Sequence, residues 1–162
     1  MFIEGIAVTF DLVSLTIRYS CDNLFLTMAI VEMELNKIRI DENRGEQVIV
    51  LKEKEGERIL PIVIGIMEVT AIKMKISGVN PPRPMTHDLF YNAITQLGAK
   101  IDKIIITKLE NNTFFAKLII SVNSRIEEID ARPSDSIAIA IRAKAQIFVD
   151  EQVLDNVSNN IE

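Results

Sequence analysis

Apolar and polar residues alternate along the chain in short runs, and turns containing Gly, Pro and Asn separate these runs. Alternation of this kind places the apolar side chains on one face of an extended strand. Strands are therefore predicted at residues 31–40, 47–52, 58–64, 103–109, 113–122, 125–131 and 147–149. Apolar residues at helical spacing predict helices at residues 65–77, 86–98 and 133–144.

The helix predicted at residues 86–98 follows a proline-rich loop. Thr86 is its expected N-cap, because a threonine hydroxyl accepts a hydrogen bond from a free N–H of the first turn. Apolar residues at helical spacing give the helix one apolar face, made of Leu89, Phe90, Ala93, Ile94 and Leu97.

The two halves of the chain resemble each other when one is shifted by about 67 positions, which places Arg58 on Arg125 and Ala71 on Ala138. The same shift sets Glu68 against Asp135. Each half then follows the order strand, strand, strand, helix. The predicted fold class is α+β, with mixed, largely antiparallel sheets and helices, built from two βββα-like repeats.

The length of 162 residues favours one domain, which we expect at residues 29–155. Residues 1–28 are interpreted as an N-terminal extension of uncertain order and residues 156–162 as a C-terminal tail. The extension carries acidic residues and lacks a basic start, so neither a signal peptide nor a membrane span is expected. A single cysteine, Cys21, fits a reducing compartment, and a cytoplasmic location is predicted.

The net charge of −5 argues against a broad basic surface that holds nucleic acid through its phosphates. Any contact with a polyanion has to be local. It would use basic side chains or a metal ion bound by carboxylates. The basic candidates are Arg83, Arg132, Arg142, Lys144, Lys100 and Lys103.

The only histidine, His87, and Asp88 follow the proline-rich loop and fall in the first turn of the predicted helix. Neighbouring residues on a helix point in different directions, so the two side chains are not expected to face one ligand unaided. Asp88 also has a purely structural interpretation, because an acidic residue near a helix N-terminus interacts favourably with the helix dipole.

A second polar cluster contains Asp130, Arg132, Ser134 and Asp135 at the start of the last predicted helix. An Asp–Arg pair here would simply fix the turn. Alternatively, Asp130 and Asp135 converge on a divalent cation, and Glu68 is the third candidate ligand. The sequence contains no glycine-rich phosphate loop, no paired-cysteine metal motif and no Gly-x-Ser-x-Gly elbow.

Four segments, in this order and spacing, closely resemble the bifunctional nuclease family: residues 60–65, 82–89, 130–135 and 147–149. The resemblance covers residues 32–154 and implies an α+β domain and, as in some members, cleavage of both DNA and RNA. It carries over the polar positions Glu68, Arg83, Thr86, His87, Asp88, Asp130, Arg132, Ser134 and Asp135. The chain departs from the family pattern at Lys144 and Gln146, where relatives tend to have glycine and proline.

An enzyme that cuts DNA as well as RNA cannot use the ribose 2′-hydroxyl as its nucleophile, so water must attack. The nuclease hypothesis uses Mg²⁺ or Mn²⁺ to activate water. The expected metal ligands are Glu68, Asp130 and Asp135. The candidate catalytic residues are His87, Asp88 and Asp135, and the candidate substrate-binding residues are Arg83, Thr86, Arg132 and Ser134.

Two other functions fit the same residues. One is a non-catalytic binding or regulatory module, in which the motifs stabilise the helix starts and a possible homo-oligomer interface. The other is a sensor that binds a small anion or a nucleotide at the helix N-termini without turnover. Nucleic acid is the expected partner of the nuclease, and no membrane association is expected.

Overall fold

The computed structural model describes residues 29–41 and 45–159. The predicted extension, residues 1–28, lies outside this range, as do residues 42–44 and residues 160–162 of the predicted tail. None of the helices in the described ranges has the length and apolar character needed to cross a bilayer.

One seven-stranded sheet forms the centre of the fold, with the order β3-β2-β1-β7-β4-β5-β6. The strands are β1 (Ile30–Asp41), β2 (Glu46–Glu53), β3 (Ile59–Ile64), β4 (Lys100–Glu110), β5 (Thr113–Val122), β6 (Arg125–Ala131) and β7 (Gln146–Asp150). Only β4 and β7 pair in parallel, and the other neighbours are antiparallel. The predicted α+β class and the mixed, mostly antiparallel pairing are thus confirmed.

Strands β1–β3 and β4–β6 form two antiparallel meanders, and β7 joins them by pairing with both β1 and β4. Each meander is followed by a helix, α1 (Ile66–Ile76) or α3 (Pro133–Ala143). A shift of 67 positions moves residue 66 onto 133 and residue 76 onto 143, so these two helices coincide in the sequence. The origin of this order in a repeat stays a prediction.

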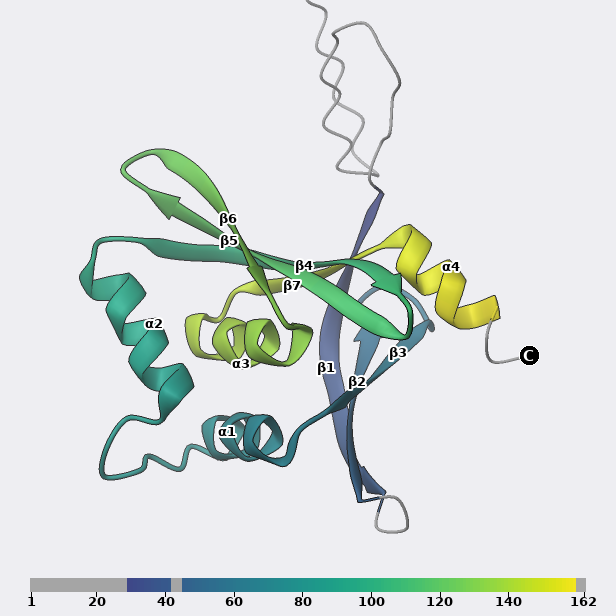
Figure 1. The fold of residues 1–162 in the computed structure, drawn as a ribbon, viewed down its shortest axis with the longest axis horizontal. Helices are drawn as coiled ribbons and strands as arrows, with labels where there is room; N and C mark the ends of the chain where they lie inside the picture. Colours follow the sequence, from purple (N-terminus) through teal and green to yellow (C-terminus); the bar gives the residue numbers. More distant parts are fainter. Residues whose placement is uncertain (1–28, 42–44, 160–162) are drawn as a thin grey trace, which may run out of the picture.

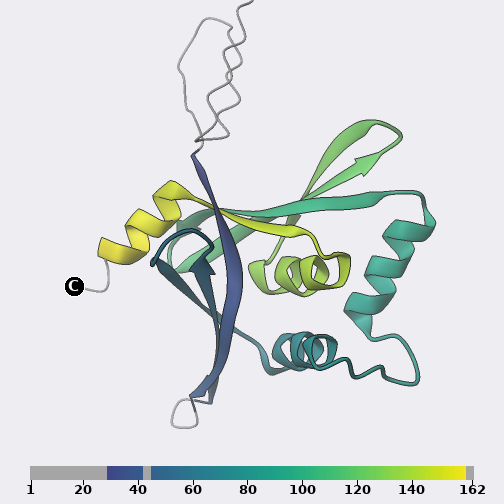
Figure 2. The same ribbon diagram turned by 180° about the vertical axis from the view of Figure 1, so that it is seen from behind.

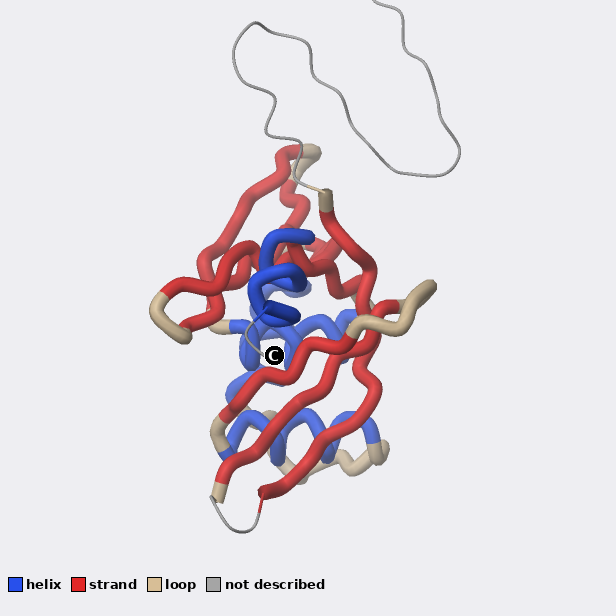
Figure 3. The backbone as a smooth tube through the Cα atoms, turned by 90° about the vertical axis from the view of Figure 1, so that its right-hand side faces the viewer, coloured by secondary structure: helices blue, strands red, loops and turns tan. Residues whose placement is uncertain are grey.

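The helices α1, α2 (Thr86–Gln96) and α3 lie together beside the sheet, with α3 between the other two (Figure 1). Helix α4 (Glu151–Asn159) lies at the end of the molecule away from α2 (Figures 1 and 2). Seen from that end, α4 stands in front and the other three helices lie behind it (Figure 3). One apolar cluster unites sheet and helices, and its fully buried members include Leu51, Ile72, Ile104, Ile137 and Leu154.

Helix α4 is absent from the sequence-based prediction and runs through the predicted boundary between domain and tail at residue 155. Its buried residues, Val153 and Leu154, contact the core while the helix packs against β3, β4 and β7. The spacing of Val153, Leu154 and Val157 was the available signal for a helix.

Two expectations for α2 differ from the structure. Met85, not Thr86, is the N-cap residue, and its backbone N–H donates to the Asp88 carboxylate over 3.0 Å. Thr86 is instead the first helical residue. The predicted apolar face is mostly exposed, because the helix packs through His87, Asp88, Tyr91 and Ile94. Of the five apolar residues expected on one face, only Ile94 is buried.

Lys144 closes α3 in the left-handed conformation, with φ 54°. Glycine adopts this conformation without steric cost, whereas a residue with a Cβ does not. The departure from the family pattern at this position therefore leaves the shape of the helix end in place but adds backbone strain.

Candidate active site

The starts of three helices bring four polar side chains together. Glu68 lies in the first turn of α1, His87 in the first turn of α2, and Asp135 in the first turn of α3, which Arg132 precedes as the N-cap residue. Helices α1 and α3 begin directly after strand ends, and α2 begins after the proline-rich loop. We call these four residues the polar cluster.

Asp135 is the centre of the polar cluster. Its Oδ1 lies 3.0 Å from Nε2 of His87, and its Oδ2 accepts from Nε of Arg132 over 2.7 Å. Nη2 of Arg132 donates to Oε1 of Glu68 over 2.8 Å. Asp135 therefore orients both a histidine and an arginine, and Arg132 links the first turns of α1 and α3.

Glu68 reaches Arg132 because Gly65, directly before α1, has no side chain. A Cβ at this position would collide with Oε2 of Glu68. The glutamate side chain folds back over the helix start and is only 14% exposed. The glycine at position 65 thus leaves room for the Glu68 carboxylate. It is not required by an unusual backbone angle, since its φ is −75°.

The Asp135 carboxylate is ionised at neutral pH. Burial raises its pKa, but hydrogen bonds from Arg132 and His87 and their charges lower it more, so that the pKa lies below its ordinary value. An ionised carboxylate only accepts hydrogen bonds, so Nε2 of His87 must carry the hydrogen that points at Asp135. In a neutral imidazole, Nδ1 then keeps its lone pair and is able to accept a proton.

Arg132 retains donors for a ligand. Its Nε and Nη2 groups bond Asp135 and Glu68, and no described residue takes the two hydrogens of Nη1. The side chain is 68% exposed. A phosphate oxygen arriving from solvent would find these hydrogens available as donors.

The predicted metal site does not fit the arrangement as it stands. Within the described residues, no three His, Cys, Asp or Glu side chains are grouped so that they could hold a metal ion. Arg132 bonds both Glu68 and Asp135, and a cation held by the same two carboxylates would meet its positive charge. Asp130 lies on β6, where it is exposed and pairs in register with Lys117 of β5.

Asp88 turns away from the polar cluster, as expected for the neighbour of His87 on a helix. Its Oδ1 accepts from Nε of Arg142 over 2.6 Å, and the Arg142 side chain is only 3% exposed. Burial raises the pKa of Asp88. Hydrogen bonds from Arg142 and the Met85 N–H lower the pKa by more, so it lies below its ordinary value. Asp88 therefore forms a partly buried ion pair and is not a free base.

Comparison with known proteins agrees with this arrangement of motifs. The model of the bifunctional nuclease domain matches residues 49–162, which include all members of the polar cluster. The chain belongs to the bifunctional nuclease domain family. The resemblance predicted from the sequence motifs is thus confirmed.

Several curated relatives place this bifunctional nuclease domain among bacterial and plant proteins. Two uncharacterized proteins, from two strains of Mycobacterium tuberculosis, are 42% identical over 123 residues, which cover 76% of this chain and 73% of theirs. Bifunctional nuclease 2 of Oryza sativa subsp. japonica is 32% identical over 114 residues, covering 68% of this chain. Bifunctional nuclease 1 of Arabidopsis thaliana is 30% identical over 107 residues, covering 64% of this chain. The match spans only 35% and 33% of these plant proteins.

The remaining candidate substrate-binding residues form no side-chain bond with the polar cluster. Arg83 and Thr86 are exposed, and neither side chain forms a hydrogen bond or ion pair with another described residue. Ser134 is buried, with 8% of its surface exposed, so a substrate-binding role would require access that its surroundings now restrict. Of the four residues predicted to bind substrate, Arg132 is the one that lies in the polar cluster.

Arg142 is the residue whose place sequence reasoning missed. It was a candidate for local contact with a polyanion, yet it is buried against Asp88 and donates to the backbone carbonyls of Ala138 and Ala71. The available signal was a charged residue within the otherwise apolar helix at residues 137–143. An arginine in such a helix needs a buried acceptor, and Asp88 supplies it.

Proposed function

We propose that this bifunctional nuclease domain hydrolyses phosphodiester bonds in DNA and RNA, with water as the nucleophile. The observation that carries the proposal is that Asp135 bonds both His87 Nε2 and Arg132, which leaves Nδ1 of the histidine as a proton acceptor and Nη1 of the arginine as a free donor. General-base catalysis requires a group of this kind within reach of the attacking water.

Each member of the polar cluster then has a separate role. His87 takes a proton from water, and Asp135 holds the imidazole in the required tautomer and stabilises the positive charge that develops on it. Arg132 binds a phosphate oxygen through Nη1, and Glu68 fixes the guanidinium in place. Asp88 acts indirectly, because its bond to Arg142 holds the helix turn that presents His87.

The charges of the polar cluster bear on a separate proposal, the involvement of Mg²⁺ or Mn²⁺. Two carboxylates and one guanidinium leave a charge of −1 when His87 is neutral, which opposes a phosphate. A divalent cation would reverse this sign, but Glu68 and Asp135 could share it only after the Arg132 side chain turned away. Loss of cleavage in chelator, with recovery in Mg²⁺ or Mn²⁺, would support such a rearrangement, and unchanged cleavage would contradict it.

The nuclease proposal is tested with highly purified protein and a fluorescent single strand, prepared as DNA and as RNA. His87→Ala should lower the cleavage rate of both about 10²–10⁴-fold, since it removes the base. Arg132→Ala should lower it about 10²–10³-fold. Arg125→Ala, which removes an exposed arginine on β6, is the matched control and should leave the rate within about twofold. Equal rates in all four proteins would show that a contaminating nuclease is responsible.

A non-catalytic binding or regulatory module is the second candidate function. It is favoured by the finding that each carboxylate of the polar cluster already has a partner and that the cluster as a whole is anionic. In that case purified protein would cleave no faster than a mock preparation, while Asp135→Ala would still lower the melting temperature by removing a bond between helices.

We also propose that the protein self-associates through the exposed side of α2. Leu89, Phe90 and Leu97 are 63%, 42% and 82% exposed, and the face they share with Ala93 carries no charge. Two copies of a chain with a net charge of −5 repel each other over most of their surfaces. A second copy is the occupant we favour, because two such faces meet without repulsion. A cytoplasmic location is a separate proposal, which the single cysteine of the chain supports.

A further inference from the structure

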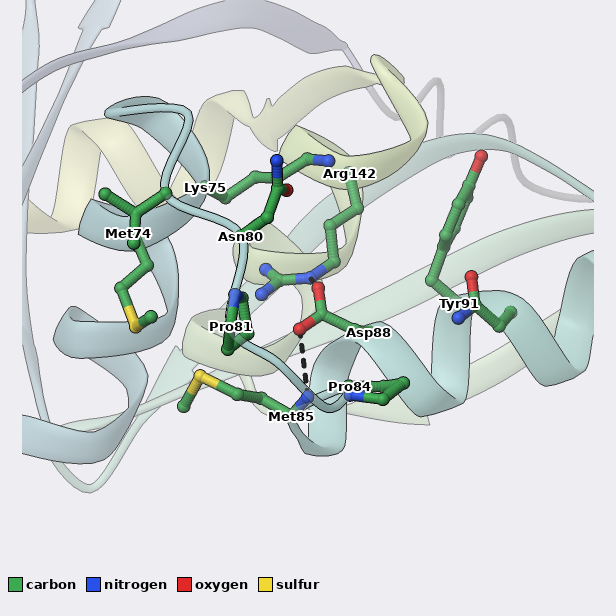
Figure 4. A pocket seen from close by; sticks show the side chains of 11 residues that line it. Met74, Lys75, Asn80, Pro81, Pro84, Met85, Asp88, Tyr91 and Arg142 are labelled. Atoms are coloured by element: carbon green, nitrogen blue, oxygen red, sulfur yellow. Dashed lines mark hydrogen bonds and ion pairs between the residues drawn. The ribbon is translucent and has the colours of Figure 1, made fainter.

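A pocket of about 260 Å³ lies on the other side of the first turn of α2 from His87. Its walls come from the C-terminal part of α1, the loop before α2, the first turns of α2, and Arg142 of α3 (Figure 4). Pockets for drug-sized ligands usually measure about 300–1,000 Å³, so this one has room for a small unit only.

The pocket carries a positive charge in a protein that is negative overall. Arg142 and Lys75 contribute two positive charges and Asp88 one negative charge. Three of the five N–H groups of Arg142 donate to described residues, and its side chain, only 3% exposed, forms part of the pocket wall, so the exposed Lys75 is the main contact for an anion. The Lys75 ammonium has no ion-pair partner among the residues that the structure describes, although it lies near enough to Asp88 to lower the pKa of that carboxyl. An anionic group is the ligand that these charges favour.

The remaining walls suit a flat heterocycle attached to that anion. Asn80 and Asn92 bring side-chain amides, each of which both donates and accepts hydrogen bonds, to the exposed part of the pocket. Met74 adds a polarizable apolar surface that packs well against a ring. A single nucleotide has the three matching parts: a phosphate for the positive charges, a base edge that hydrogen-bonds the amides, and a ring face that packs on the methionine.

The pocket lies within reach of a strand bound at the polar cluster. Asp135 and Arg142 are seven residues apart on α3, which corresponds to about 10 Å along the helix axis. This is about three steps of a stacked strand at roughly 3.4 Å per nucleotide. Resting on the proposed nuclease function, we propose that the pocket binds one unpaired nucleotide of the strand whose phosphate lies at His87 and Arg132, within a few nucleotides of it.

A paired base cannot enter such a pocket unless it leaves its helix, which costs stacking and pairing energy. The pocket therefore selects single-stranded DNA and RNA over a duplex. Selection of this kind does not need the broad basic surface that the charge of the chain excludes, because stacking and a few local charges provide the affinity.

The experiment measures binding of a fluorescein-labelled oligothymidylate by anisotropy, using the full chain with His87→Ala to prevent cleavage. Lys75→Gln should raise the Kd at least about tenfold, the loss expected for one charged hydrogen bond to a phosphate. Lys73→Gln is the matched control, because Lys73 is also exposed on α1 and does not line the pocket, and it should raise the Kd less than about twofold. Binding to a duplex of the same length should not depend on Lys75.

Equal effects of the two lysine substitutions, or no binding of the oligothymidylate at all, would overturn the proposal. A cleavage assay on protein that retains His87 distinguishes failure of the pocket proposal from failure of the nuclease proposal. If that protein cleaves, and Lys75→Gln raises KM no more than Lys73→Gln, the pocket proposal is wrong and the nuclease stands. If it does not cleave, and binding still depends on Lys75, the pocket stands as a binding site alone.

Discussion

Nε of Arg142 donates to Oδ1 of Asp88 over 2.6 Å, and this ion pair joins α3 to the first turn of α2. The same guanidinium donates to the carbonyls of Ala138 and Ala71, so one side chain of α3 connects this helix to both α1 and α2. The turn that carries His87 is therefore held from the side opposite to the polar cluster.

Asp88→Ala should lower the free energy of unfolding by about 3 kcal/mol, because it leaves a guanidinium that is only 3% exposed without its counter-charge. Urea denaturation measures this loss. Asp102→Ala is the control, since its partner Lys100 is 80% exposed and the pair should contribute less than about 1 kcal/mol. Similar losses for the two variants would mean that the Asp88–Arg142 pair holds the helices no better than a surface pair.

Acid should destabilise the protein through Asp88 and Asp135. Both have a pKa below the ordinary value in the folded state, so their ionised forms stabilise it at neutral pH. This contribution is complete above the pKa of the unfolded chain and is lost as the pH falls below about 4. The free energy of unfolding should therefore decline between about pH 5 and pH 2. Asp88→Asn should make that decline shallower, and an unchanged slope would contradict the assignment.

Lys144→Gly should stabilise the protein by about 0.5–1 kcal/mol. The left-handed conformation of Lys144 costs about 1–2 kcal/mol, and the greater entropy of glycine in the unfolded chain offsets part of that gain. Thermal unfolding followed by circular dichroism measures the change. Ala143→Gly, one residue earlier and still helical, should have the opposite sign.

The self-association proposal predicts an oligomer whose dissociation constant depends on α2. Light scattering after size-exclusion chromatography, over a series of protein concentrations, gives the mass. Leu97→Lys should raise the dissociation constant at least about tenfold, because it places a charge in the apolar contact. Ile126→Lys is the matched control on β6, where the side chain is 71% exposed, and should leave the mass unchanged. A wild-type protein that is monomeric throughout would end the proposal.

The strands and three of the helices could be predicted from the sequence because their signals are local. Strand β5 and strand β6 match the predicted ranges, and α3 begins at Pro133 as expected. Helix α4 was missed although its apolar spacing is regular, because it is short and follows a strand without a turn signal. The capping of α2 by Asp88 rather than Thr86 also depends on the path of the loop.

The site could be predicted only as a set of residues. The motifs identified the four members of the polar cluster, since charged groups at helix starts stand out from an apolar background. They did not indicate which groups bond each other. The predicted metal site grouped Glu68, Asp130 and Asp135, but Asp130 lies exposed on β6. Only the structure shows that Arg132 bonds Glu68 and Asp135.

The sequence by itself determined which segments become strands and helices, because alternation and helical spacing act over a few residues. It also determined that ionisable groups gather at helix starts, where they meet free backbone N–H groups. The tertiary structure decided that β7 pairs between β1 and β4, that α2 turns an apolar face to solvent, and that His87 and Asp88 serve different partners. These relationships join residues tens of positions apart, and packing of the whole sheet against the helices is what sets the distances between them.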